Sequence, residues 1–193
     1  MYYLNQTEYP TVPYPHDLDH GGVPVGRGNV ANAACGPCCA CMVVNNLTFA
    51  RLTLPEALRL SGEVGANRDV GTDLSILGPA VARCYGLTYA NSYDIADALA
   101  CLAAGGMVIA NPGGDRDGKV GLFTHGGHYI VLVSAEDGEL TILDPALSEA
   151  RFAEEGRRGR VRISYPFVYA PVETVREECV RPWPSYHLFK RKK

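Results

Sequence analysis

The chain has 193 residues, of which 47% are hydrophobic and 20% charged, and its formal net charge is -3. These proportions are typical of a globular protein and exclude wholesale disorder, collagen-like repeats and coiled coil. The length suits one domain with a full hydrophobic core, and the charge balance gives no broad basic surface for nucleic acid or an anionic membrane. We therefore expect a single domain over residues 1–193 and no nucleic-acid partner.

No segment of the sequence looks like an export signal or a membrane span. The N-terminus has neither the basic start nor the apolar run of a secretory signal, and the longest uncharged stretch, 28–50, carries Asn and Pro side chains that a bilayer core disfavours. Seven cysteines are too few, and odd in number, for a disulfide scaffold. We expect a cytoplasmic, reducing location, with export by another route left open. The basic run 190–193 is interpreted as a solvated tail, with a nuclear or lipid address as the alternative.

The N-terminal part of the sequence predicts a strand, a loop and a buried helix. Residues 2–6 predict a short strand, and a long ordered loop through Asp17 and Asp19 follows. Pro37 suits the first turn of a helix, and the apolar run after it predicts a helix that is buried on most sides and ends near Phe49.

Three more helices are predicted from their start and stop signals. Thr53 and Glu56 form a capping-box pattern that opens a helix, and Gly62 is placed to stop it. Further helices are expected over about 73–85 and 94–104, each followed by glycine.

The apolar pattern then changes to the period of two that is typical of strands. Asp137-Gly138 is a hairpin turn between two of these strands. Helices first and an antiparallel sheet afterwards predict an α+β domain of two layers. The strands are expected at 107–110, 127–135, 139–143, 161–164 and 186–189.

Cys35 stands where the irregular N-terminal segment meets the first buried helix. A sulfur at a helix N-terminus lies near free backbone N–H groups and the positive end of the helix dipole, which favour a thiolate. This position suits a nucleophile. The alternative is one more small buried residue in a helix rich in Cys and Ala.

A thiolate nucleophile needs a base within hydrogen-bond reach, and His128 is the best candidate among five histidines. It opens an apolar strand, and Gly126-Gly127 before it allow a substrate or another backbone to approach closely. The alternative is a satisfied core histidine. Three of the other histidines are expected at the surface: His16, His20 and His187. The fourth, His125, is expected on the opposite face of the strand from His128.

Asp144 ends the strand that returns from the Asp137-Gly138 hairpin, and sheet pairing makes it a neighbour of His128. A carboxylate there would hold the imidazole in one tautomer and stabilise the imidazolium, as the third member of a catalytic triad does. Aspartate before proline is also a common turn former, which is the alternative interpretation.

Together these residues resemble the C39-like peptidases, a branch of the papain-like cysteine peptidases. The resemblance covers about residues 3–145. It implies the papain-like fold, with N-terminal helices packed on an antiparallel sheet, and a peptide or protein as the substrate. It lies in three motifs in this order: Ala34-Cys35-Gly36-Pro37 opening a helix, Gly126-Gly127-His128 opening a strand, and Asp144-Pro145 after a hairpin.

The family also uses a glutamine ahead of the cysteine as an oxyanion donor. The resemblance gives this role first to Gln6, and second to Asn29, which has the more usual spacing from the cysteine. Either amide, with the backbone N–H of Cys35, would hold the oxyanion of a tetrahedral intermediate. The best-known members precede an ABC exporter and cut leader peptides after a Gly-Gly pair. This sequence carries no membrane or ATPase segment, so the exporter role does not transfer.

Metal or redox chemistry at the crowded cysteines is an alternative for the same segment. On a helix the four cysteines Cys35, Cys38, Cys39 and Cys41 spread over more than one face, so the cluster does not converge on one metal. Cys35 and Cys38 form a C-x-x-C pair that lacks a preceding thioredoxin-like strand pattern. Residues 113–118 lack the closing Glu of a calcium loop and are interpreted as a flexible loop that could gate a substrate. We expect no metal site and no cofactor.

The sequence thus predicts a thiol hydrolase that cleaves a peptide or amide bond through Cys35, His128 and Asp144. One alternative is a catalytically silent module of the same fold that binds peptides, although the intact triad argues against it. Another is an acyl or amine transferase similar to transglutaminases, in which an amine captures the acyl-enzyme.

Overall fold

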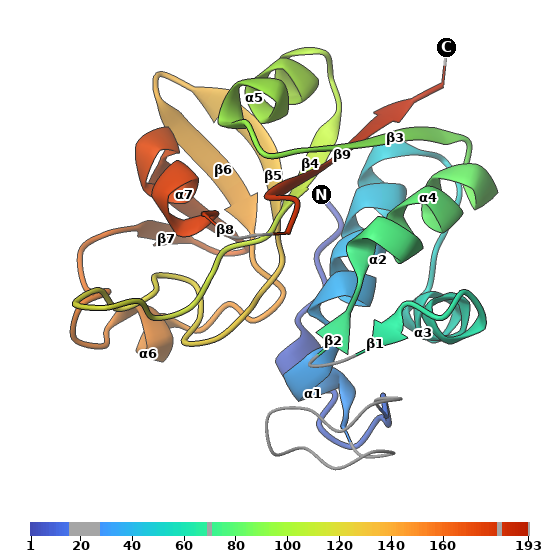
Figure 1. Cartoon of the computed structure of the whole chain (residues 1–193), viewed down its shortest axis with the longest axis horizontal. Coiled ribbons are helices and arrows are strands. Elements are labelled where there is room, and N and C mark those ends of the chain that lie inside the picture. The colour runs from blue at the N-terminus through green and yellow to red at the C-terminus, as the bar shows by residue number, and fades with distance from the viewer. Residues whose placement is uncertain (16–27, 69–70, 181–182, 193) are drawn as a thin grey trace.

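The computed structural model describes residues 1–15, 28–68, 71–180 and 183–192. Its centre is an antiparallel sheet in the order β3-β9-β4-β5-β6-β8-β7, and a small second sheet pairs β1 with β2. Figure 1 shows α2, α3 and α4 gathered on one side of the molecule, opposite β6, β7 and β8. The strands are β1 (Asn67–Arg68), β2 (Gly71–Thr72), β3 (Leu87–Ser92), β4 (Met107–Ala110), β5 (Ile130–Glu136), β6 (Glu139–Leu143), β7 (Arg162–Ser164), β8 (Phe167–Pro171) and β9 (Tyr186–Arg191).

Helices α4 and α5 begin at aspartate caps and are followed by glycines, as their sequence signals predict. The side chains of Asp73 and Asp94 accept backbone N–H groups in the first turns of α4 and α5. Gly86 and Gly105, just after these helices, have φ of 66° and 75°, which L residues rarely adopt. The helices are η1 (Gln6–Glu8, a 3-10 turn), α1 (Val30–Ala33), α2 (Cys35–Leu47), α3 (Leu54–Glu63), α4 (Leu74–Cys84), α5 (Ile95–Ala103), α6 (Glu149–Phe152) and α7 (Val172–Glu178).

The large sheet separates two apolar cores because its side chains alternate between the two faces. Met107 and Ile109 of β4 pack with α2 and α4, whereas Val108 and Ala110 of the same strand pack with α5 and α7. Helix α2 is buried on almost every side, as its apolar run predicts. The order of helices and antiparallel strands confirms the α+β prediction.

The hairpin between β5 and β6 forms as predicted. Asp137 and Gly138 have φ of 49° and 80°, which is the left-handed backbone that a two-residue turn requires. The strand β5 begins at Ile130, later than the predicted start at residue 127, so His128 lies in the connection before the strand.

The predicted strand over residues 2–6 is wrong. In place of a strand ladder, the backbone N–H of Tyr2 donates to the Asn46 side chain, and that of Gln6 donates to the carbonyl of Pro145 at 2.7 Å. A 3-10 turn follows from Gln6. The predicted loop through Asp17 and Asp19 lies outside the described residues.

The last strand, β9, lies between β3 and β4 inside the sheet. This position corrects the expectation that His187 is a surface residue, because the side chain is buried and its Nδ1 hydrogen-bonds with the hydroxyl of Tyr89 at 2.8 Å. Burial lowers the pKa of His187 to about 4.

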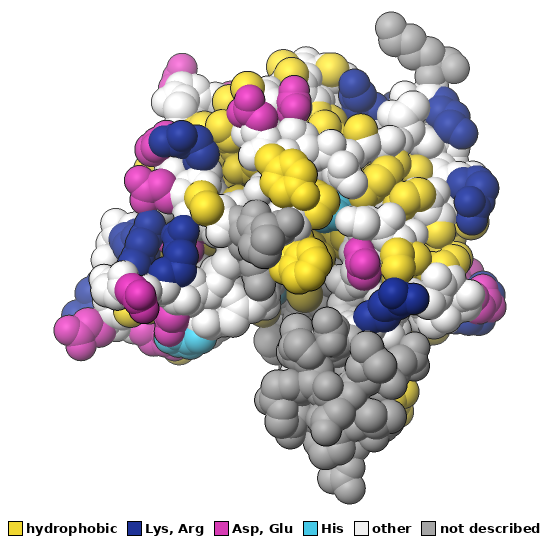
Figure 2. All heavy atoms as spheres, in the orientation of Figure 1, with side chains coloured by type: hydrophobic (Ala, Val, Ile, Leu, Met, Phe, Trp, Pro, Cys, Tyr) yellow, Lys and Arg dark blue, Asp and Glu magenta, His cyan; other side chains and the backbone are white. Residues whose placement is uncertain are grey.

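The surface carries charges of both signs. Figure 2 shows acidic and basic side chains interspersed over the face in view. Within the described ranges, no helix combines the length and the apolar character that crossing a bilayer requires.

Candidate active site

Cys35 is the first residue of α2 and is partly exposed, whereas the residues that follow it are buried. The helix N-terminus is held close to β2. A Cβ added at Gly36 would lie 2.7 Å from the Cβ of Thr72, so only glycine allows this approach. Pro37 lies in the first turn, where the backbone N–H that proline lacks would have no acceptor within the helix. The sequence Cys-Gly-Pro therefore starts the helix at the cysteine and leaves its sulfur at the surface of the core.

His128 reaches the site from the connection that leads into β5. Its backbone N–H donates to the carbonyl of Pro112 at 3.3 Å, and its side chain is only 7% exposed. Nε2 hydrogen-bonds with Oδ1 of Asp144 at 2.8 Å. Cys35 lies close enough to His128 to help raise the pKa of the imidazole, and Nδ1 is the ring nitrogen that Asp144 leaves for it.

Asp144 follows directly after β6, which pairs with β5, and its side chain is fully buried. Oδ1 accepts from His128 and also from the backbone N–H of Ala146 at 2.8 Å, while Oδ2 pairs with Arg151. Burial alone raises the pKa of a carboxyl, but the charges of His128 and Arg151 and these hydrogen bonds hold the pKa of Asp144 below its usual value. Asp144 is thus an ionised partner for His128.

The charge of Asp144 decides the protonation of His128. Burial lowers the pKa of an imidazole, but attraction to Asp144 and the hydrogen bonds to Asp144 and Cys35 outweigh it and raise the pKa of His128 to about 9. At neutral pH the imidazole is therefore an imidazolium, flanked by a carboxylate on one side and by the sulfur of Cys35 on the other.

The two oxyanion candidates have different environments. Gln6 is buried, its backbone is bound to Pro145, and its Nε2 donates to the carbonyl of Ala31 at 2.8 Å, which places its amide between α1 and the turn after Asp144. Oε1 of Gln6 has no partner among the described residues. Asn29 instead caps α1, where its Oδ1 accepts the backbone N–H of Asn32 at 3.1 Å. Gln6 is therefore the buried amide of the two, and Asn29 is the one committed to a helix cap.

Two further residues of the site had no signal in the sequence. Arg151, from the short helix α6, pairs with Asp144 although it lies beyond the stretch that resembles the C39-like peptidases. The hydroxyl of Tyr3 donates to the backbone carbonyl of Asp144 at 2.8 Å. Tyr3 falls within that stretch, but nothing in the spacing of the residues pointed to this contact.

The cysteines that follow Cys35 in α2 are buried in one apolar core. Sγ of Cys39 donates to the carbonyl of Tyr129 at 3.4 Å, which ties α2 to the residue after His128. Cys38 and Cys41 are buried with the N-terminal segment and α3. Among the residues that the structure describes, no group of three or more His, Cys, Asp or Glu side chains could hold a metal ion. The loop around Gly114 packs against the backbone of His125, and Nδ1 of the His125 side chain hydrogen-bonds with Oδ2 of Asp115 at 2.9 Å.

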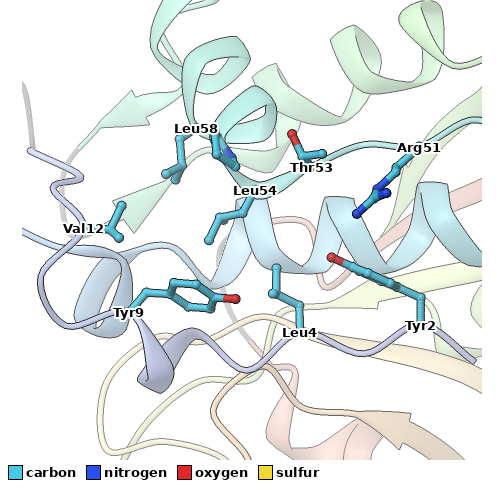
Figure 3. Close-up of a pocket in the computed structure, with 9 residues that line it drawn as sticks. Tyr2, Leu4, Tyr9, Val12, Arg51, Thr53, Leu54 and Leu58 are labelled. Carbon is cyan, nitrogen blue, oxygen red and sulfur yellow. The ribbon is translucent and has the colours of Figure 1, made fainter.

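An open groove of about 310 Å³ runs beside α2, between the N-terminal segment and the start of α3. Figure 3 shows Leu4 and Tyr9 on one wall and Leu54 facing them, with Arg51 above Tyr2 at one end. Neither Cys35 nor the residues that bind it line this groove, so it is separate from the candidate site.

Comparisons with known proteins identify the fold. No protein-family model matches the sequence, and no curated protein does. Among solved structures, the chain is similar to the peptidase domain of Streptococcus ComA, a bifunctional ABC transporter involved in quorum sensing, with 13% identity, a TM-score of 0.52 and coverage of 82% of this chain and 91% of that one. It is also similar to a C39-like peptidase from Bacillus anthracis, with 13% identity, a TM-score of 0.54 and full coverage of both chains.

The chain thus has the fold of C39 peptidase domains, which confirms the papain-like α+β fold predicted from the sequence. At 13% identity the shared property is the fold. What the site does must be argued from its own geometry.

Proposed function

We propose that the chain is a cysteine-type peptidase that cleaves a peptide or amide bond through Cys35, His128 and Asp144. One observation carries this proposal: the imidazole of His128 is bound at 2.8 Å by the buried carboxylate of Asp144 and lies close to the partly exposed sulfur of Cys35. A nucleophile, a base and a group that orients the base are the minimum for acyl transfer by a thiol.

In the proposed reaction the proton of Cys35 resides on His128, and the sulfur attacks the carbonyl carbon of the substrate. The oxyanion that forms accepts hydrogen bonds from the backbone N–H of Cys35 and from the Gln6 amide, whose Nε2 carries a second N–H beyond the one given to Ala31. His128 then gives its proton to the leaving amine, and a water molecule releases the acid from the thioester. Asp144 keeps Nε2 of His128 occupied, so that Nδ1 faces the sulfur throughout.

The substrate class rests on the fold. The two solved structures named above are described as a peptidase domain and a C39-like peptidase, which supports a peptide or protein substrate for a single domain over residues 1–193. All seven cysteines are free, which supports a reducing, cytoplasmic compartment.

The first test is the pH dependence of alkylation by iodoacetamide, measured for each cysteine by peptide mass spectrometry. Cys84 is exposed and serves as the internal control within the same sample. We expect Cys35 to react at least tenfold faster than Cys84 at pH 6, and His128→Ala to remove that difference. Equal rates for Cys35 and Cys84 in the wild-type chain would leave a silent peptide-binding module as the better description.

The second test identifies the reaction. The wild-type chain and Cys35→Ser are incubated with a peptide library, with and without an amine acceptor, and the products are identified by mass. New carboxyl termini that depend on Cys35 support a peptidase. Amide adducts of the acceptor, in place of free acids, would show a transferase and overturn the hydrolytic assignment.

A further inference from the structure

The first turn of α2 carries a second thiol next to the proposed nucleophile. Cys35 is the first residue of the helix and Cys38 the fourth, with Gly36 and Pro37 between them. Residues three apart lie on the same side of a helix. The geometry of an ideal helix puts their Cα atoms about 5 Å apart, within the range that a disulfide spans. The pair is therefore placed for a bond without a large movement of the backbone.

The two thiols differ in access. Cys35 is partly exposed, whereas Cys38 is fully buried. Cys38 lies in the same buried core as Leu4 and Tyr14, which belong to the N-terminal part of the chain. A reagent in solution therefore reacts with Cys35 first, and Cys38 then reacts with the modified Cys35.

Of the other cysteines in this helix, Cys39 is the nearest competitor. Its distance along the helix also falls within disulfide range. Its sulfur, however, is held toward the sheet by a hydrogen bond to the carbonyl of Tyr129 at 3.4 Å. Cys41 is about 9 Å further along the helix axis than Cys35, which is too far. Among the described residues, Cys38 has no comparable side-chain hydrogen bond.

We propose that Cys35 and Cys38 form a reversible disulfide within the first turn of α2 on reaction with a low-molecular-weight disulfide such as oxidised glutathione. This makes the pair a redox modification site. The inference rests on the proposed function in one respect, which is that Cys35 is the reactive thiol of the chain.

The reaction balances in two exchange steps. The thiolate of Cys35 attacks one sulfur of the small disulfide, forms a mixed disulfide and releases one small thiolate. Cys38 then loses its proton, its thiolate attacks the sulfur of Cys35, and a second small thiolate leaves and takes up a proton. Two protein thiols are oxidised and one small disulfide is reduced to two thiols. Burial, with the nearby Cys41 and Cys35, raises the pKa of Cys38 well above its usual value, so Cys38 is rarely a thiolate and this second step is the slower one.

The test is differential labelling of the full chain. The protein is treated with oxidised glutathione, free thiols are blocked with N-ethylmaleimide, the protein is unfolded and reduced, and the newly released thiols are labelled with iodoacetamide. Fragment masses then assign each label. We expect the second label on Cys35 and Cys38 together, and its loss when dithiothreitol is added before blocking.

Two variants on the same helix sharpen the test. Cys38→Ala should stop at the mixed disulfide, with glutathione retained on Cys35. Cys39→Ala is the matched control, because it removes an adjacent buried thiol, and it should still form the disulfide as the wild-type chain does. A second label on Cys35 and Cys39, or a mixed disulfide that persists on Cys35 in the wild-type chain, would overturn the proposal. If Cys38→Ala fails to fold, labelling of the wild-type chain alone decides the outcome.

Failure of this inference differs from failure of the proposed function. A chain that forms the Cys35–Cys38 disulfide but cleaves no peptide refutes the peptidase alone. A chain that cleaves peptides in a Cys35-dependent way but accumulates only the mixed disulfide refutes the redox site alone.

Discussion

The ion pair between His128 and Asp144 predicts that the protein loses stability as the pH rises through about 9. Despite the opposing effect of burial, Asp144 raises the pKa of His128 from 6.5 to about 9. Because the folded state holds this proton more tightly than the unfolded state, the stabilisation is complete below pH 6.5 and is lost as the pH rises through the folded-state pKa. A rise of about 2.5 pH units, at about 1.36 kcal/mol per unit, corresponds to about 3 kcal/mol.

The assay compares the wild-type chain with His128→Gln by urea unfolding at a series of pH values from 6 to 10, in the presence of a reductant. Glutamine cannot ionise, and Asp144 keeps Arg151 as a charged partner in the variant. Tyrosines and lysines titrate in both chains, so their effect cancels in the difference. The difference in the free energy of unfolding should be constant below pH 6.5 and should fall by about 3 kcal/mol by pH 9.5.

The same comparison in a Cys35→Ser background shows how much of this effect depends on the sulfur, since Cys35 also raises the pKa of His128. A difference that stays constant from pH 6 to pH 10 would refute the reasoning, because it would mean that His128 is already neutral at pH 6 or that its charge is equally stable in the unfolded chain.

Two more predictions concern residues that support the site. Arg151→Met leaves the buried carboxylate of Asp144 with one charged partner fewer, so the free energy of unfolding in urea titrations should fall by about 3 kcal/mol. Arg151→Lys should recover part of this loss. An unchanged free energy of unfolding in both variants would contradict the pairing of Arg151 with Asp144. Gly36→Ala should lower the free energy of unfolding, measured by thermal unfolding, by about 1 to 3 kcal/mol, because the new Cβ would clash with Thr72. The control is Gly62→Ala in α3, whose new Cβ has no atom within 4 Å, and it should leave the stability unchanged or raise it. Equal effects of the two variants would show that β2 does not pack tightly against the start of α2.

The parts of the fold that sequence could predict are those set by local signals. Aspartates at caps and glycines after helices fix α4 and α5, and the Asp137-Gly138 turn fixes the hairpin that brings Asp144 beside His128. For the same reason the candidate triad could be named from the sequence: each member lies next to a local start or stop signal.

What sequence could not predict depends on contacts between distant segments. The edge strand β3 is mostly exposed and shows little alternation, so it has no clear strand signal. His187 is buried because β9 is paired on both sides, which the sequence of β9 alone does not reveal. The partnership of Arg151 with Asp144 likewise depends on how α6 folds back after β6.

The position of β9 also sets an order on how the sheet can be assembled. Within the large sheet, β9 pairs with β3 on one side and with β4 on the other, and β5 lies beyond β4. The ladder partners of β3 are therefore about a hundred residues further along the chain, as in the pair of Leu87 with Arg191. During synthesis, helices α2 to α4 and the β5–β6 hairpin can form early from neighbouring residues, but β3 must wait. Pairings of such long range are slow to close, so we expect docking of β9 to be the late event that joins the two halves of the protein.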